Sequence, residues 1–168
     1  MAISFRIFTI LLFSQTWAYS QAWKATDVTV YDTFEDIEKN FALSDDSIHV
    51  INFWATWCKP CVAELPFFEE AVDLTSKRAV KFTYISLDFA KHIETRVIPL
   101  LNNMKISANV VLLADGKYNN WIDKVDPSWS GAIPATVIIQ GNKKIFFEGS
   151  FHSNEEIIEL IKKIKTQS

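Results

Sequence analysis

The stretch that decides the fold is Trp54-Ala55-Thr56-Trp57-Cys58-Lys59-Pro60-Cys61, which joins an apolar segment to a helical one. The segment His49–Ala55 is almost continuously apolar over the length of a strand, as expected for a strand covered on both faces. From Pro60 to about Ser76 the apolar residues recur with the period of a helix. Pro60 suits the first turn of that helix, because the amide hydrogen it lacks would have no partner there. Cys58 is therefore predicted at the N-terminus of a helix that follows a buried strand.

This position gives the two cysteines different chemistry. Cys58 and Cys61 are the only cysteines of the chain, and a disulfide between them would close too small a loop to constrain the unfolded chain. A redox role therefore fits better than a structural one. The unpaired amides and the dipole of the helix N-terminus stabilise a thiolate at Cys58, and the Lys59 ammonium adds to the effect. Cys61 lies one turn further on, so Cys58 is predicted to attack a disulfide and Cys61 to resolve the mixed disulfide.

Other uses of a cysteine pair have less support. A structural zinc site normally takes four ligands, and the three histidines, His49, His92 and His152, lie at no ligand spacing. Peroxidase chemistry would use a single activated cysteine, and the residues before Cys58 show no pattern of that kind. A module that holds copper or a partner protein through the two thiols stays open as an alternative.

Length and composition fit one compact domain. The 168 residues are 49% hydrophobic and 22% charged, which is enough apolar material for a single core and too little polarity for disorder. The formal net charge is −3, and no basic patch indicates a nucleic-acid partner.

The N-terminus has the pattern of a secretory signal peptide. Arg6 precedes the apolar run Ile7–Phe13, and small residues follow at Ala18, Ser20 and Ala22. We predict a signal peptide over residues 1–18, with cleavage as late as 22, and a domain over 19–168. The run is short of the about 20 residues that span a bilayer, although an uncleaved anchor is the alternative. No cysteine lies near the cleavage region, which excludes a lipid anchor there. The expected location is the bacterial periplasm or cell envelope, in soluble form.

The remaining pattern alternates strands with helices and closes with a hairpin and a helix, which predicts an α/β sandwich around one mixed sheet. Residues 117–131 are expected to form a loop with one short helical turn. The expected strands cover 28–31, 49–55, 80–87, 109–113, 136–140 and 144–148, and the expected helices cover about 33–41, 60–76, 92–104 and 153–165.

The cysteine motif resembles the active site of the thioredoxin family. The extension Val62-Ala63-Glu64-Leu65-Pro66 and the downstream Gly131-Ala132-Ile133-Pro134-Ala135-Thr136 are similar to its TlpA/ResA-like branch of exported bacterial thiol–disulfide oxidoreductases. The resemblance covers about residues 28–165. It implies a thioredoxin fold, with four or five strands, flanking helices and the TlpA-type central insertion. It also implies a monomeric protein-disulfide reductase without a cofactor, acting on protein disulfides or dithiols and served by a membrane electron donor. An oxidase or isomerase of the same fold is the alternative.

The resemblance assigns further site residues. Pro134 matches a cis-proline that faces the cysteine pair, and Ile133 would offer backbone groups to a substrate. Glu64 matches an acid near the cysteines and shares a helix face with Cys61. If partly buried it would have a raised pKa and could exchange a proton with Cys61, whereas the alternative is a solvated surface glutamate. Asn52 stands where thioredoxins carry a buried aspartate, which leaves Glu64 as the better proton acceptor.

The tryptophans are expected to differ in role. Trp57 should shape the exposed surface beside Cys58 and contact substrate, while Trp54 should pack in the core. Trp121 and Trp129 lie in the loop before Pro134. They could line a substrate groove or simply cover the core.

Overall fold

The computed structural model describes residues 28–41 and 46–166, with the side chains of 39–41 left out. The predicted signal peptide lies outside these residues. Within the described ranges, no helix is both long enough and apolar enough to cross a membrane. The elements in chain order are β1 (Thr29–Tyr31), α1 (Phe34–Phe41), β2 (Ile48–Trp54), α2 (Lys59–Thr75), β3 (Val80–Ser86), the 3₁₀ turn η1 (Ala90–His92), the π-helical η2 (Ile93–Val97), α3 (Ile98–Met104), β4 (Asn109–Leu113), the 3₁₀ turn η3 (Tyr118–Asn120), α4 (Ile122–Val125), β5 (Ala135–Gln140), β6 (Lys143–Glu148) and α5 (Asn154–Thr166).

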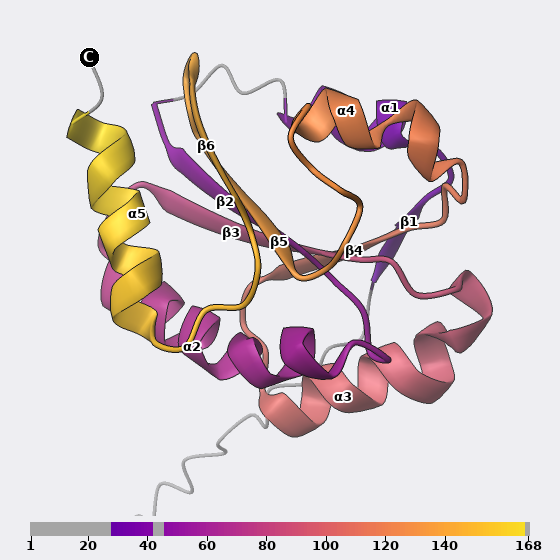
Figure 1. Cartoon of the computed structure of the whole chain (residues 1–168). Coiled ribbons are helices and arrows are strands. Elements are labelled where there is room, and N and C mark those ends of the chain that lie inside the picture. The colour runs from indigo at the N-terminus through magenta and orange to yellow at the C-terminus, as the bar shows by residue number, and fades with distance from the viewer. Residues whose placement is uncertain (1–27, 42–45, 167–168) are drawn as a thin grey trace, which may run out of the picture.

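The strands form one mixed sheet in the order β1-β4-β3-β2-β5-β6. The neighbouring pairs β1–β4, β4–β3 and β3–β2 are parallel, whereas β2–β5 and β5–β6 are antiparallel. Figure 1 shows α2, α3 and α5 on one face of the sheet and α1 and α4 on the other. The predicted thioredoxin-type α/β fold is therefore confirmed.

The sheet has six strands, whereas the resemblance implies four or five. The segment from Ala90 to Leu113 supplies a helical stretch and β4, which lies between β1 and β3. We assign this unit as the central insertion. Residues 118–125 form the short η3 and α4, where one short helical turn was expected.

Local sequence explains the element boundaries nearest the site. All seven residues of β2 are buried, as the continuous apolar run predicted. Pro60 lies in the first turn of α2, with Cys58 as the N-cap residue. The β5–β6 hairpin turns at Gly141, whose φ of +57° suits a residue without a side chain.

Two apolar cores hold the sheet between its helices. On one face Leu65 and Phe68 of α2 pack with Ile157 and Ile161 of α5. On the other face, buried aromatic and aliphatic residues of α1, β2 and the loop before β5 pack together; they include Phe34, Ile37, Phe53, Trp121 and Trp129. Because β2 contributes side chains to both cores, packing on both faces of the sheet fixes its position.

Candidate active site

The cysteines lie where β2 passes into α2, and they form a disulfide with Sγ atoms 2.01 Å apart. Cys58 is in an extended conformation as the N-cap of α2. The backbone amide of Cys61 donates to the Cys58 Sγ at 3.3 Å. The capping acceptor of this helix is therefore the sulfur itself, and the amide would favour a negative charge on it after reduction.

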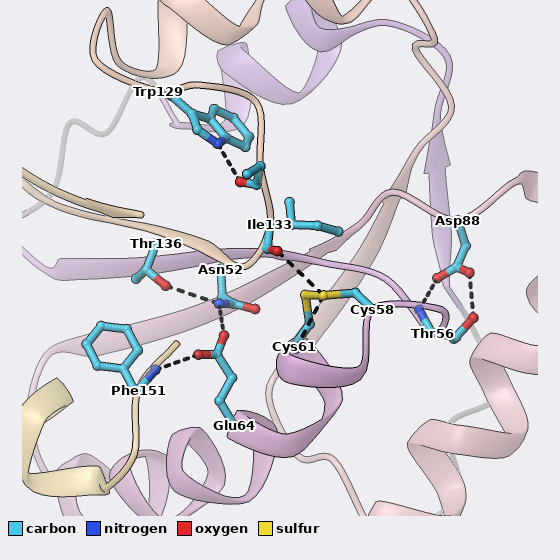
Figure 2. The surroundings of a disulfide bond; sticks show 11 residues. Asn52, Thr56, Cys58, Cys61, Glu64, Asp88, Trp129, Ile133, Thr136 and Phe151 are labelled. Atoms are coloured by element: carbon cyan, nitrogen blue, oxygen red, sulfur yellow. Dashed lines mark hydrogen bonds between the residues drawn. A yellow bond between two sulfur atoms is a disulfide. The ribbon is translucent and has the colours of Figure 1, made fainter. Parts of the chain in front are cut away.

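Strand register brings a second segment against the cysteines. Phe53 near the end of β2 pairs with Ala135 at the start of antiparallel β5. The residues after β2 and before β5 consequently meet at the same edge of the sheet. The Ile133–Pro134 peptide bond is cis, in agreement with the resemblance. The carbonyl oxygen of Ile133 lies 3.7 Å from the Cys58 Sγ, as Figure 2 shows.

Trp129 contacts the segment that leads into Pro134. Its indole Nε1 donates to the carbonyl of Ala132 at 2.7 Å, and its ring packs against Phe53 with centroids 4.8 Å apart. Gly131 adopts a φ of +90°, and a Cβ at that position would meet Ile122 at 3.1 Å. Both features favour one path for the chain into Pro134.

Burial shows which of the four tryptophans near the site lie in the core. Trp54 is buried in the core, as predicted, and Trp57 is 58% exposed beside Cys58. Trp121 and Trp129 are buried, and Trp121 stacks on Phe34 with centroids 5.2 Å apart. These two cover the core, and the alternative in which they line a substrate groove is wrong.

Glu64 is a buried carboxyl group, only 1% exposed, so the alternative of a solvated surface glutamate is wrong. Its Oε1 accepts from Asn52 Nδ2 at 2.9 Å, and its Oε2 accepts from the amide of Phe151 at 2.8 Å. Burial raises the pKa of Glu64 to about 7, while the hydrogen bonds from Phe151 and Asn52 oppose that rise. Glu64 therefore holds a proton for part of the time near neutral pH.

The direction of the Glu64 side chain differs from the simplest expectation. Figure 2 shows the carboxylate turned toward Asn52 and the Phe151 amide rather than toward the two sulfur atoms. Asn52 also donates to Thr136 Oγ1 at 3.1 Å, which links α2, β2 and β5 in one buried network. Within the described structure, the Oδ1 of Asn52 is buried without a hydrogen-bond partner.

Asp88 is a site residue that the sequence did not single out. Its buried carboxylate accepts from the Thr56 amide at 2.8 Å, from Thr56 Oγ1 at 2.6 Å and from Ser86 Oγ at 2.9 Å. Parallel β2 and β3 are in register, with Trp54 opposite Ser86, so the two loops that follow them lie together. Asp88 could have been predicted from its place in the sequence, because it lies just beyond the carboxyl end of a central strand, where functional groups of α/β proteins occur.

Across residues 28–41 and 46–166, no group of three or more His, Cys, Asp or Glu side chains could hold a metal ion.

Comparison with known proteins places the chain in a family. Residues 22–147 match the model of the AhpC/TSA family, which is most of the chain. The chain belongs to the AhpC/TSA family. Named relatives agree with the resemblance seen in the cysteine motif. It is 26% identical over 95 residues to the thiol-disulfide oxidoreductase ResA of Geobacillus thermodenitrificans, covering 56% of this chain and 49% of ResA. It is 28% identical over 101 residues to a thioredoxin of Malassezia sympodialis, covering 60% and 87%.

The aligned parts of the ResA proteins are short. The chain spans about half the length of the Geobacillus protein and 20% of the ResA of Oceanobacillus iheyensis, with 41% identity over 39 residues. Among solved structures, a thioredoxin-related protein from Neisseria meningitidis serogroup B has a TM-score of 0.64 at 19% identity, covering 87% of this chain and 98% of that one. This similarity shows the fold.

Proposed function

We propose that this protein is an exported thiol–disulfide oxidoreductase that reduces disulfides of proteins in the bacterial envelope. The observation that carries the proposal is the Cys58–Cys61 disulfide at the N-terminus of α2, beside the Ile133 carbonyl. A disulfide that closes so short a loop contributes little to stability. The ResA names of relatives support the same chemistry.

Cys58 is the attacking nucleophile in this proposal. After reduction its thiolate would accept the hydrogen bond that the Cys61 amide already donates to the sulfur. The α2 dipole and the adjacent Lys59 ammonium stabilise the same charge. Cys61 is fully buried behind it, which suits a resolving thiol that reacts only within the mixed disulfide.

The exchange balances without a cofactor. The Cys58 thiolate attacks one sulfur of the substrate disulfide, which forms a mixed disulfide and releases the other sulfur as a thiolate. The Cys61 thiolate then attacks the Cys58 sulfur, which closes the Cys58–Cys61 bond and releases the second substrate thiolate. Two electrons pass from the protein to the substrate, and each released thiolate takes up a proton.

Substrate contacts are proposed at Trp57, Ile133 and Pro134. Trp57 is exposed next to Cys58, and the Ile133 carbonyl already lies against the Cys58 sulfur. An extended substrate segment whose cysteine bonds to Cys58 would run beside the backbone at residues 133–134. Main-chain hydrogen bonds would fix its position and be largely indifferent to its sequence.

Glu64 is proposed to take up the proton that Cys61 loses in the resolving step. The support is its position one helical turn after Cys61 and a pKa raised by burial to about 7. Because the carboxylate bonds to Asn52 and Phe151, the transfer requires a rotation of the side chain or an intervening water molecule. Glu64→Gln should slow resolution by a constant factor below about pH 7, because the Glu64 carboxylate and the Cys61 thiolate then decline in parallel as the pH falls. Above that pH the factor should shrink, because Cys61 ionises without help. Superimposable pH–rate curves for the two proteins would refute this role.

Export and partners complete the proposal. Residues 1–18 would act as the signal peptide and residues 19–168 as the mature domain, working as a monomer because one chain holds the complete dithiol site. A solved structural relative is described as a secreted Mycobacterium tuberculosis disulfide oxidoreductase. A membrane protein would return the electrons that each catalytic cycle consumes.

Trapping tests the proposed roles of the cysteines. Cys61→Ser should accumulate mixed disulfides with envelope proteins through Cys58, and Cys58→Ser should accumulate few or none, as judged by non-reducing electrophoresis and mass spectrometry. Equal trapping by both variants would refute the roles. Copper(I) titration of the reduced protein tests the alternative, since tight stoichiometric binding would indicate a metal carrier.

A further inference from the structure

Among residues 28–38 and 46–166, Phe89 is the most exposed aromatic side chain of the large apolar ones, at 68%. It directly follows Asp88, whose carboxylate holds Thr56, the residue before Trp57. Phe89 and the exposed Trp57 therefore extend from two loops that are hydrogen-bonded to each other at the edge of the sheet that carries Cys58 (Figure 2 shows the Thr56–Asp88 contact).

These two aromatic residues are held by rigid neighbours. Asp88 and Ser86 are buried and bond to each other, and Asp88 also accepts two hydrogen bonds from Thr56. The Phe89 ring is contacted by the His92 ring, with centroids 6.0 Å apart, and by the Lys91 Nζ at 5.6 Å. An exposed aromatic side chain on a fixed loop loses little entropy on binding, which favours an anchor for a partner.

Two lysines are exposed beside these aromatic residues, whereas the Asp88 carboxylate between the two loops is buried and accepts hydrogen bonds from Thr56 and Ser86. Lys59 is exposed next to Cys58, and Lys91 is exposed over the Phe89 ring. Glu94 and Arg96, further along the same segment, are both exposed and offset each other. A carboxylate of a partner would be attracted to the ammonium groups of Lys59 and Lys91.

We propose that Trp57 and Phe89, with Lys59 and Lys91, form a docking surface for cysteine-containing protein segments that carry an aromatic residue and a carboxylate beside the cysteine. This inference rests on the proposed function, since the segment is the substrate whose disulfide Cys58 attacks. The partner's aromatic ring packs between Trp57 and Phe89, and its carboxylate faces the two lysines. The surface extends the contacts at Ile133 and Pro134 with side-chain selectivity, which main-chain contacts cannot supply.

The test uses the fully reduced protein in single-turnover reactions with three disulfides. Two are peptides whose single cysteine is linked to glutathione by a disulfide. In the first peptide the cysteine is flanked by phenylalanine and glutamate, and in the second by serine and glutamine. The third is glutathione disulfide. The wild-type protein should reduce the phenylalanine–glutamate peptide about tenfold faster than the serine–glutamine peptide, because buried aromatic anchors dominate contact energies. Added salt should weaken this preference.

Phe89→Ala should lower the preference to about twofold, and Phe89→Leu should restore part of it. Leu74→Ala is the matched control, because Leu74 is 62% exposed and lies 13 residues beyond Cys61 in α2, about 20 Å along the helix axis. It should keep the wild-type preference. An undiminished preference in Phe89→Ala, with all disulfides still reduced, would overturn the docking surface alone. Failure of the wild type to reduce any of the three would overturn the proposed function and the docking surface with it.

Discussion

Replacing Glu64 by glutamine is expected to remove a pH dependence of stability that the buried carboxyl group imposes. Glu64 is 1% exposed, and burial raises its pKa from 4.5 to about 7. Between these two pH values the unfolded chain has released the proton that the folded chain still holds. The free energy of unfolding therefore falls as the pH rises through this window, and the full stability is present below pH 4.5.

The size of the effect follows from the same two values. Each pH unit between the two pKa values corresponds to about 1.4 kcal/mol, so the loss in the wild type between about pH 4 and pH 8 is about 3 kcal/mol. Glutamine has no titrating group and should show none of this loss. The free energy of unfolding of the wild type should therefore exceed that of the variant by most at low pH. The difference between the two proteins should narrow as the pH rises, because only the wild type loses this stability.

The glutamine side chain can fit the site because Asn52 offers a second hydrogen-bonding mode. The Phe151 amide can still donate to the side-chain oxygen of the glutamine. If the Asn52 amide rotates, its Oδ1, which has no hydrogen-bond partner in the described structure, can accept from the new NH₂ group.

The assay is urea unfolding of the oxidised proteins from about pH 4 to pH 8, followed by tryptophan fluorescence. Oxidation is needed because a Cys58–Cys61 disulfide removes the two thiols from the titration. Glu70→Gln, which removes an exposed carboxylate from the same helix, controls for the change in net charge. A constant stability difference between the wild type and Glu64→Gln across the whole range would refute the reasoning.

Three further outcomes are expected. Asp88→Asn should lower the free energy of unfolding by about 2 kcal/mol, because the side chain loses charge while Thr56 and Ser86 still need acceptors; chemical unfolding measures this, and wild-type stability would contradict it. The reduction potential of the Cys58–Cys61 couple, measured in a glutathione redox buffer, should be more negative than the about −120 mV of DsbA; a value near that figure would favour an oxidase. Mass spectrometry of the protein from the envelope fraction should find an N-terminus between about residues 19 and 23; an intact Met1 in membranes would instead indicate an anchor.

Local patterns were sufficient for most of the secondary structure. The apolar run before Cys58 predicted β2, and Pro60 with the 3.6-residue period predicted α2. The Gly141 turn predicted the hairpin of β5 and β6. These signals are carried by neighbouring residues, so the sequence contains them without knowledge of the fold.

By itself, the sequence determined the cysteine pair at a helix N-terminus, the buried central strand and, through the resemblance, the cis-proline segment. Only the tertiary structure decided which groups face these residues. The Thr56–Asp88, Cys58–Ile133 and Glu64–Phe151 contacts join residues 32, 75 and 87 positions apart. Such pairs depend on strand register and on the packing of α5 against α2, which no local pattern encodes. The tertiary structure therefore fixed the burial of Glu64, the direction of its carboxylate and the exposure of Phe89.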